Sequence, residues 1–236
     1  MTNHTDRPQN PNSHIDLSQF WSSHLGLTLV TMSLAVIVFV VTPLREAGLP
    51  SRLFFDIVVV ALMIFGTLVI DQSRMAKAFA IAVVLVSAIV VGTGRLHPTP
   101  FLHLLGSASV IVTLLLYVRI VLLVMFNKGP LTWSRIQGGV CVYLLIGMVW
   151  ASAFQFLEQL RPGSFHFASA PMDLDQLTSR LTYFSFATLT TVGSTIAPVD
   201  PFARSLTIAE AIVGQLFPAT LIAALVAMAM RPGPKS

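Results

Sequence analysis

The residues best suited to chemistry lie in one short run, Thr190-Thr191-Val192-Gly193, in the last loop between two long apolar segments. The strand from Thr191 to Gly193 offers backbone carbonyl oxygens, and Thr191 can add its side-chain hydroxyl. Glycine suits a position where a carbonyl must turn in a backbone conformation closed to other residues. Oxygens of this kind are ligands for a cation. The candidate cation ligands are Thr191, Val192, Gly193 and Ser194.

A short helix is expected to present this run. Asp173 with Gln176 three residues later, after Pro171, has the pattern of a helix N-cap and its reciprocal partner. The helix should continue to about Leu189. A helix C-terminus carries about half a negative charge. If four copies of this helix converge, their C-terminal ends favour a cation in the central cavity between them. One chain supplies one strand and a ring of ligands needs four, so we expect a homotetramer with a fourfold axis.

The composition places these elements in a membrane. Of the 236 residues, 55% are hydrophobic and only 10% are charged, whereas a soluble domain carries about 25% charged residues. The net charge of +4 comes from basic residues scattered singly between apolar runs, so a nucleic-acid partner is excluded. The expected partners are membrane lipid, monovalent cations and further copies of the chain.

Enzymes and secondary transporters are the competing classes. The ionisable residues within apolar segments are few and not clustered, and the sequence has no paired acids, nucleophile motif or metal-binding constellation. It also lacks the paired interrupted segments that mark inverted-repeat transporters. We therefore expect no enzymatic activity and no cofactor besides the permeant ion.

Six segments have the length and apolar character of membrane spans, which need about 20 residues. Between the last two lies 158–201, too polar at first to span and too apolar later to be a free loop. Backbone of this kind at membrane depth must be buried by protein or line a water-filled cavity. The sequence thus predicts an all-α integral membrane protein with six spans and a re-entrant loop. The spans are Leu25–Leu44, Leu53–Ile70, Ala78–Gly94, Phe101–Phe126, Ile136–Leu157 and Phe202–Met230.

The segment from Tyr183 to Met228 resembles the pore region of bacterial potassium channels of the two-helix-plus-pore-loop type. Three stretches carry the resemblance, namely 188–193, 198–206 and 210–216. It implies a tetrameric cation channel that conducts passively through the Thr-Val-Gly carbonyls, with K⁺ as the expected ion. The number and position of the first four spans are similar to the sensor-like domain of six-span channels.

The filter departs from that family's pattern in three ways. Ser194 replaces the filter aromatic, and Thr195 stands where the pattern has a second glycine. From Gly193 to Pro198 the segment is one residue shorter, and the acid after the filter is missing. Three readings therefore remain open: selective potassium conduction, less selective cation conduction, and a non-conducting channel fold that acts through partners.

These observations define four regions and an orientation. Residues 1–24 form a polar, disordered tail, 25–127 a four-helix sensor-like membrane domain, 128–230 the pore domain, and 231–236 a short tail. A slight excess of Lys and Arg on one side of the spans places both termini in the cytoplasm. The chain is thus expected to be a multi-pass protein of the cell membrane.

The last span holds the candidate gating and supporting residues. Pro218 removes the hydrogen bond to the carbonyl of Gly214, so the helix should bend there, either as a gating hinge or as a static kink. Glu210 is an acid within a span, and such residues usually have a partner or line a cavity. Arg180 or Arg204 is the expected partner in a structural ion pair behind the filter.

Overall fold

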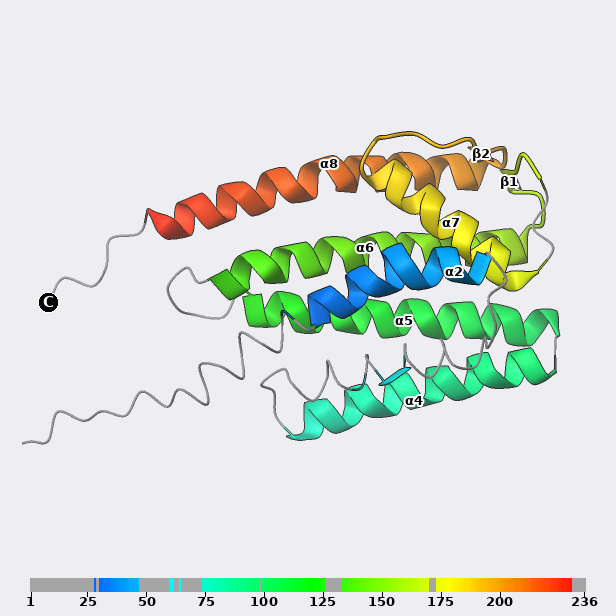
Figure 1. The fold of residues 1–236 in the computed structure, drawn as a ribbon, viewed down its shortest axis with the longest axis horizontal. Helices are drawn as coiled ribbons and strands as arrows, with labels where there is room; N and C mark the ends of the chain where they lie inside the picture. The colour runs from blue at the N-terminus through cyan, green and yellow to red at the C-terminus, as the bar shows by residue number, and fades with distance from the viewer. Residues whose placement is uncertain are drawn as a thin grey trace, which may run out of the picture.

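The computed structural model describes residues 28, 30–46, 60–61, 64, 74–97, 99–125, 133–169 and 173–230. The expected tails 1–24 and 231–236, and nearly all of the second expected span, lie outside these residues. Within the described part of the chain, α-helices form almost the whole molecule, and a single pair of two-residue strands accompanies them (Figure 1).

Four helices are long and apolar enough to cross a membrane among the described residues. They confirm the last four predicted spans as helices and show an all-α membrane protein. Their bounds exceed the predicted ones by a few residues at most ends, because helices continue into polar flanking residues. The four are α4 (Arg74–Leu96), α5 (Pro100–Met125), α6 (Trp133–Leu160) and α8 (Pro201–Ala229).

The first predicted span is observed as an apolar helix from Val30 to Leu44. Its second half contains a π-helical turn, η1 (Ile37–Val41), followed by α2 (Thr42–Glu46). The amide of Thr42 bonds to the carbonyl of Ile37, and its hydroxyl donates to the same oxygen at 2.9 Å. Pro43 has no amide hydrogen and its ring crowds the carbonyl four residues earlier, so the helix widens by one residue just before it.

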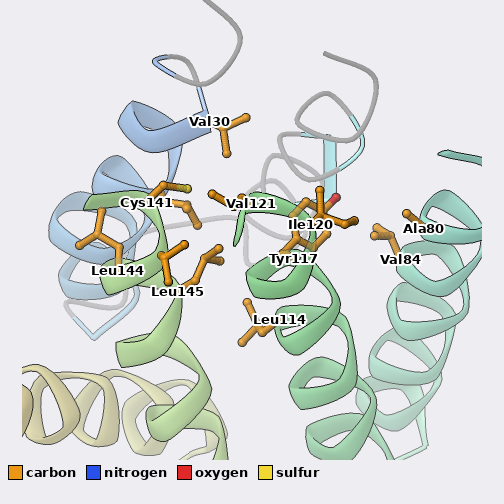
Figure 2. Close-up of a cluster of buried hydrophobic side chains, with 12 residues drawn as sticks. Val30, Ala80, Val84, Leu114, Tyr117, Ile120, Val121, Cys141, Leu144 and Leu145 are labelled. Carbon is orange, nitrogen blue, oxygen red and sulfur yellow. The ribbon is translucent and has the colours of Figure 1, made fainter. Parts of the chain in front are cut away.

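The helices α4, α5 and α6 lie side by side, and the Val30–Leu44 helix packs against them (Figure 1). A continuous apolar core joins these four helices (Figure 2). Leu114 and Cys141 are almost fully buried in this core, which fits a cysteine acting as a small apolar residue. Two interhelical hydrogen bonds add to the packing, from Ser107 to Gln159 at 3.0 Å and between Ser87 and Ser109 at 3.0 Å.

The shorter helix α7 (Leu174–Leu189) lies between α6 and α8 (Figure 1). The predicted N-cap is confirmed, because the Asp173 carboxylate accepts from the amide of Gln176 at 2.9 Å. Sixteen residues span about 24 Å, less than the roughly 30 Å of the hydrocarbon core. The chain also returns to the side from which it left, since β1 (Phe165–His166) pairs antiparallel with β2 (Ala197–Pro198). These two facts give the segment between the strands the geometry of a re-entrant loop.

Candidate ion pore

The sign of the backbone angle φ alternates over the three residues 191–193, which follow α7. Thr191 has a φ of 59° and Gly193 a φ of 89°, whereas Val192 between them has a negative φ. Thr191 is the one non-glycine residue with positive φ in the described part of the chain. A β-branched residue in this conformation is a true outlier, and such strain persists where the surrounding structure enforces it.

Alternating hand brings successive amides to one side of the chain and successive carbonyls to the other. The amides of Val192 and Gly193 both point to the carbonyl of Ala187, at 2.9 and 3.3 Å. The side of this segment that carries the two amides therefore faces the C-terminal end of α7. The strand itself is exposed in the protomer, with Val192 at 80%. The three predicted ligands Thr191, Val192 and Gly193 thus form one exposed segment outside the two β-strands, and its amides are bonded on its inner side.

The alternation ends at Gly193. Neither Ser194 nor Thr195 has a positive φ, and the hydroxyl of Ser194 accepts from the amide of Ile196 at 3.1 Å. The fourth predicted ligand, Ser194, therefore uses its side chain within its own turn. Ile196 is only 8% exposed and packs with Phe154, a residue of α6.

Ile196 is a site residue that the sequence reasoning missed. It belongs to a buried cluster whose aromatic members pack edge to face, with ring centroids 5.1–5.4 Å apart, a favourable arrangement. A cluster of this kind fixes the position of the segment that follows residues 191–193. The available signal was a single large apolar side chain in the otherwise small or polar stretch 194–198. The aromatic members are Phe154, Phe165 and Phe184.

Two polar side chains support the base of the strand. The amide of Gln215 donates to the hydroxyl oxygen of Thr191 at 3.3 Å, and the hydroxyl of Tyr143 donates to the carbonyl of Leu189 at 3.2 Å. Neither residue was identified from the sequence, although a glutamine within an apolar span was a visible signal.

The predicted hinge residues occupy an unbroken helix. The helix α8 contains Pro218 without interruption from Pro201 to Ala229. Gly214 touches the end of α7, and a Cβ placed on it would lie 2.1 Å from the carbonyl oxygen of Leu189. Close approach of two backbones therefore accounts for the glycine. The hinge role of Gly214 and Pro218 stays a prediction.

The predicted ion pair behind the filter does not form in this structure. Glu210 is fully buried, and its carboxyl group lies against the hydroxyl of Ser185 rather than a guanidinium. The guanidinium of Arg180 donates to the carbonyl of Ser169, and that of Arg204 donates to the carbonyl of Pro198 at 3.2 Å. The reason is helical geometry: at 100° per residue, Arg204 is about 120° around α8 from Glu210, and Arg180 is about 140° around α7 from Ser185.

Hydrogen bonds and an ion pair join the two ends of the re-entrant loop. The Glu158 carboxylate accepts from the amides of Gly163 at 2.8 Å and Phe165 at 3.0 Å. The carbonyl of Ser164 accepts from the amides at 199 and 200. The guanidinium of Arg161 pairs with Asp200 at 3.4 Å. These bonds tie the turn after α6 to the start of α8.

Comparison with known proteins finds a match for this region. Residues 141–231 match the family model described as an ion channel, a stretch that includes most of α6, all of α7, the strand 191–193 and α8. No curated protein and no solved structure matches the chain. The match indicates that residues 141–231 form an ion channel domain in this membrane protein.

Proposed function

We propose that this protein is a tetrameric channel that passes monovalent cations, K⁺ first among them, through the carbonyl oxygens of residues 191–193. The observation that carries the proposal is the alternating backbone of this strand. Because the amides of Val192 and Gly193 are bonded to Ala187, the carbonyl side of the strand is left toward the exposed face. Carbonyl rings that replace a hydration shell are the basis of cation selection in such filters.

The uneven burial of the helices supports a fourfold assembly. Only 11% of the most apolar part of α8 is buried, against 39% for α5 and 33% for α6. The exposed residues of α8 include Gln215 and Thr220, and polar side chains in a span usually face a cavity or another helix rather than lipid. Four copies with α8 toward a common axis would place these side chains and the four filter strands around one pore.

The sign of φ stops alternating at Gly193, and this affects the expected selectivity for K⁺ over other cations. A filter whose ordered carbonyls stop there has fewer complete rings than the family pattern, so less selective cation conduction is the second candidate. The non-conducting channel fold, which acts through partners, is the third. The three share the same protomer and differ only in what the tetramer passes.

The remaining architecture is proposed on the sequence reasoning above. The protein has six spans in the cell membrane, with both termini in the cytoplasm, a sensor-like domain over 25–127 and a pore domain over 128–230. Thr191, Val192, Gly193 and Ser194 line the filter. Gly214 and Pro218 form the gating hinge of α8.

The test is ion flux into liposomes that contain purified protein of verified oligomeric size, with K⁺ and Na⁺ measured separately. Flux of K⁺ alone supports the selective channel, and flux of both ions supports the less selective one. Binding of K⁺ to the detergent-solubilised tetramer is measured in parallel, because a closed gate blocks flux but leaves the filter sites accessible to equilibration. A tetramer with neither flux nor K⁺ binding overturns the conducting proposals, and a monomer overturns the assembly.

A further inference from the structure

Glu210, Ser185 and Gly147 form a buried polar contact between three helices. The Ser185 hydroxyl oxygen of α7 lies 2.7 Å from the Gly147 carbonyl oxygen of α6 and 2.5 Å from Oε1 of Glu210 in α8. Ser185 and Glu210 are both fully buried within one protomer. The contact therefore exists independently of assembly or ion conduction.

The number of available hydrogens decides which of these groups carries a proton. A serine hydroxyl has one hydrogen, whereas a backbone carbonyl and an ionised carboxylate can only accept. Two acceptors lie within hydrogen-bond distance of Ser185 Oγ, so an ionised Glu210 would leave two oxygen atoms facing each other at close range with no hydrogen between them. A proton on Oε1 of Glu210 resolves the conflict, because Glu210 then donates to Ser185 and Ser185 donates to Gly147.

The second carboxyl oxygen supports the same assignment. Oε2 of Glu210 is buried and has no hydrogen-bond partner among the described residues. In an ionised group this oxygen would share the negative charge, and a buried charge without a partner is strongly unfavourable. In a neutral acid protonated on Oε1, Oε2 is an ordinary carbonyl oxygen, for which the lack of a partner is far less unfavourable.

Among the described residues, no ion pair includes Glu210. The ion pairs found in the described residues join Arg95 to Asp175 and Arg161 to Asp200, not to Glu210. The titratable group that faces Glu210 from α6 is the phenol of Tyr143, whose hydroxyl donates to Leu189. On α7 the facing group is the hydroxyl of Ser185.

We propose that Glu210 is a neutral carboxylic acid that donates to Ser185 and thereby fastens α8 to α7 and α6. Glu210 and Gly214 are one turn apart and lie on the same face of α8. The acid therefore acts beside the point where α8 meets the end of α7. A charge at this position would draw water between the helices, whereas a neutral donor keeps the contact dry and closed.

The protonation state can be measured without a substitution. The chain contains three glutamates, Glu46, Glu158 and Glu210, so protein labelled with ¹³C at the glutamate carboxyl carbon gives at most three signals in solid-state NMR. At neutral pH we expect one signal at the position of a protonated acid and the others at the carboxylate position. Glu158, whose carboxylate accepts two amides, is the internal reference for an ionised group.

Glu210→Gln assigns the signal, because the protonated-acid resonance should disappear in this variant while the carboxylate signals stay. An infrared difference spectrum of wild type minus E210Q should likewise show a carboxylic C=O stretch. Only carboxylate signals in the wild-type protein would overturn the proposal. The Gln variant should melt close to wild type, since its amide N–H donates to Ser185 in place of the acid.

Ser185→Ala measures what the contact contributes. We expect it to lower the melting temperature by several degrees and to shift the carboxylic C=O frequency, because Glu210 loses its acceptor. Ser152→Ala is the matched control, since the hydroxyl of Ser152 donates only to Met148 in its own helix at 2.9 Å. Equal melting of S185A and S152A with an unshifted C=O stretch would show that the three helices are not joined through this proton.

Discussion

The α-carbon of Gly214 lies so near the carbonyl of Leu189 that no side chain fits between the two backbones. An added Cβ would lie 2.1 Å from the oxygen, 2.9 Å from the carbonyl carbon and 3.0 Å from the α-carbon of Leu189. All three atoms belong to the main chain, so no rotamer change relieves the overlap. The last turn of α7 and the middle of α8 are thus in direct contact just before the proposed filter residues 191–193.

Gly214→Ala should therefore displace α7 from α8. Overpacking of this kind costs about 1–3 kcal/mol, and the displacement is transmitted to Thr191, two residues after Leu189. We expect a lower melting temperature and a loss or change of ion flux in the same preparation.

The control for this substitution is Gly92→Ala in α4, where an added Cβ meets no atom within 4 Å. Alanine favours a helix over glycine by about 0.5–1 kcal/mol, so G92A should be as stable as wild type or slightly more so. A G214A variant that melts and conducts like G92A would show that the close approach is absent in the membrane.

In the described part of the chain, two glycines have positive φ, and a comparison of them separates the effect of backbone strain from an effect on function. Gly193 has a φ of +89° and Gly163 a φ of +88°, and an added Cβ meets no atom within 4 Å at either site. Gly193→Ala and Gly163→Ala should therefore each cost about 1–2 kcal/mol from the left-handed backbone alone. Only G193A should alter flux or K⁺ binding, because only Gly193 belongs to the proposed filter. Equal effects of the two variants on K⁺ binding would count against the filter.

Local signals in the sequence were sufficient to predict the long helices that the structure describes and the start of α7. The cap at Asp173 was predicted because a cap depends on residues three apart in the chain. The partner of Glu210 was not predicted, because partners across helices depend on how each helix is rotated about its axis. Ile196 was missed for a related reason: its burial depends on three phenylalanines from other elements, which no local pattern reveals.

Asp200 combines two roles at the start of α8, and three variants can separate them. Its carboxylate accepts from the amides of Phe202 at 2.8 Å and Ala203 at 3.3 Å, and it pairs with the half-exposed Arg161. Loss of a helix cap costs about 0.5–2 kcal/mol, whereas an exposed ion pair contributes about 0–1 kcal/mol. We therefore expect Asp200→Ala to lower the melting temperature more than Asp200→Asn, which keeps the cap and loses only the charge.

Arg161→Ala removes the ion pair and also the contact of the guanidinium with the ring of Phe202, at 4.3 Å to the centroid. That contact adds about 0.5–1 kcal/mol at an exposed site, so R161A should fall between the two Asp200 variants. If D200N instead destabilises as much as D200A, the ion pair rather than the cap holds the start of α8.

We expect Ile196 to be the main anchor of the segment that follows the proposed filter. It is 8% exposed within the cluster of Phe154, Phe165 and Phe184, and replacing a buried Ile with Ala costs about 2–5 kcal/mol. Ile196→Ala should lower the melting temperature, and it should also change the ratio of K⁺ to Na⁺ flux, because the strand loses its anchor three residues after Gly193.

Ile208→Ala is the matched control on α8, because the side chain is 62% exposed in the protomer and its removal costs little packing within the protomer. Ile196→Val, which removes one methylene, should cost only about 0.5–1.5 kcal/mol and leave the flux ratio near that of wild type. If I196A changed stability but left the flux ratio at the I208A value, Ile196 would support the fold of the outer segment without setting the filter. A graded change through I196V to I196A in both measurements would instead tie selectivity to this packing, since the same lost atoms would then account for both effects.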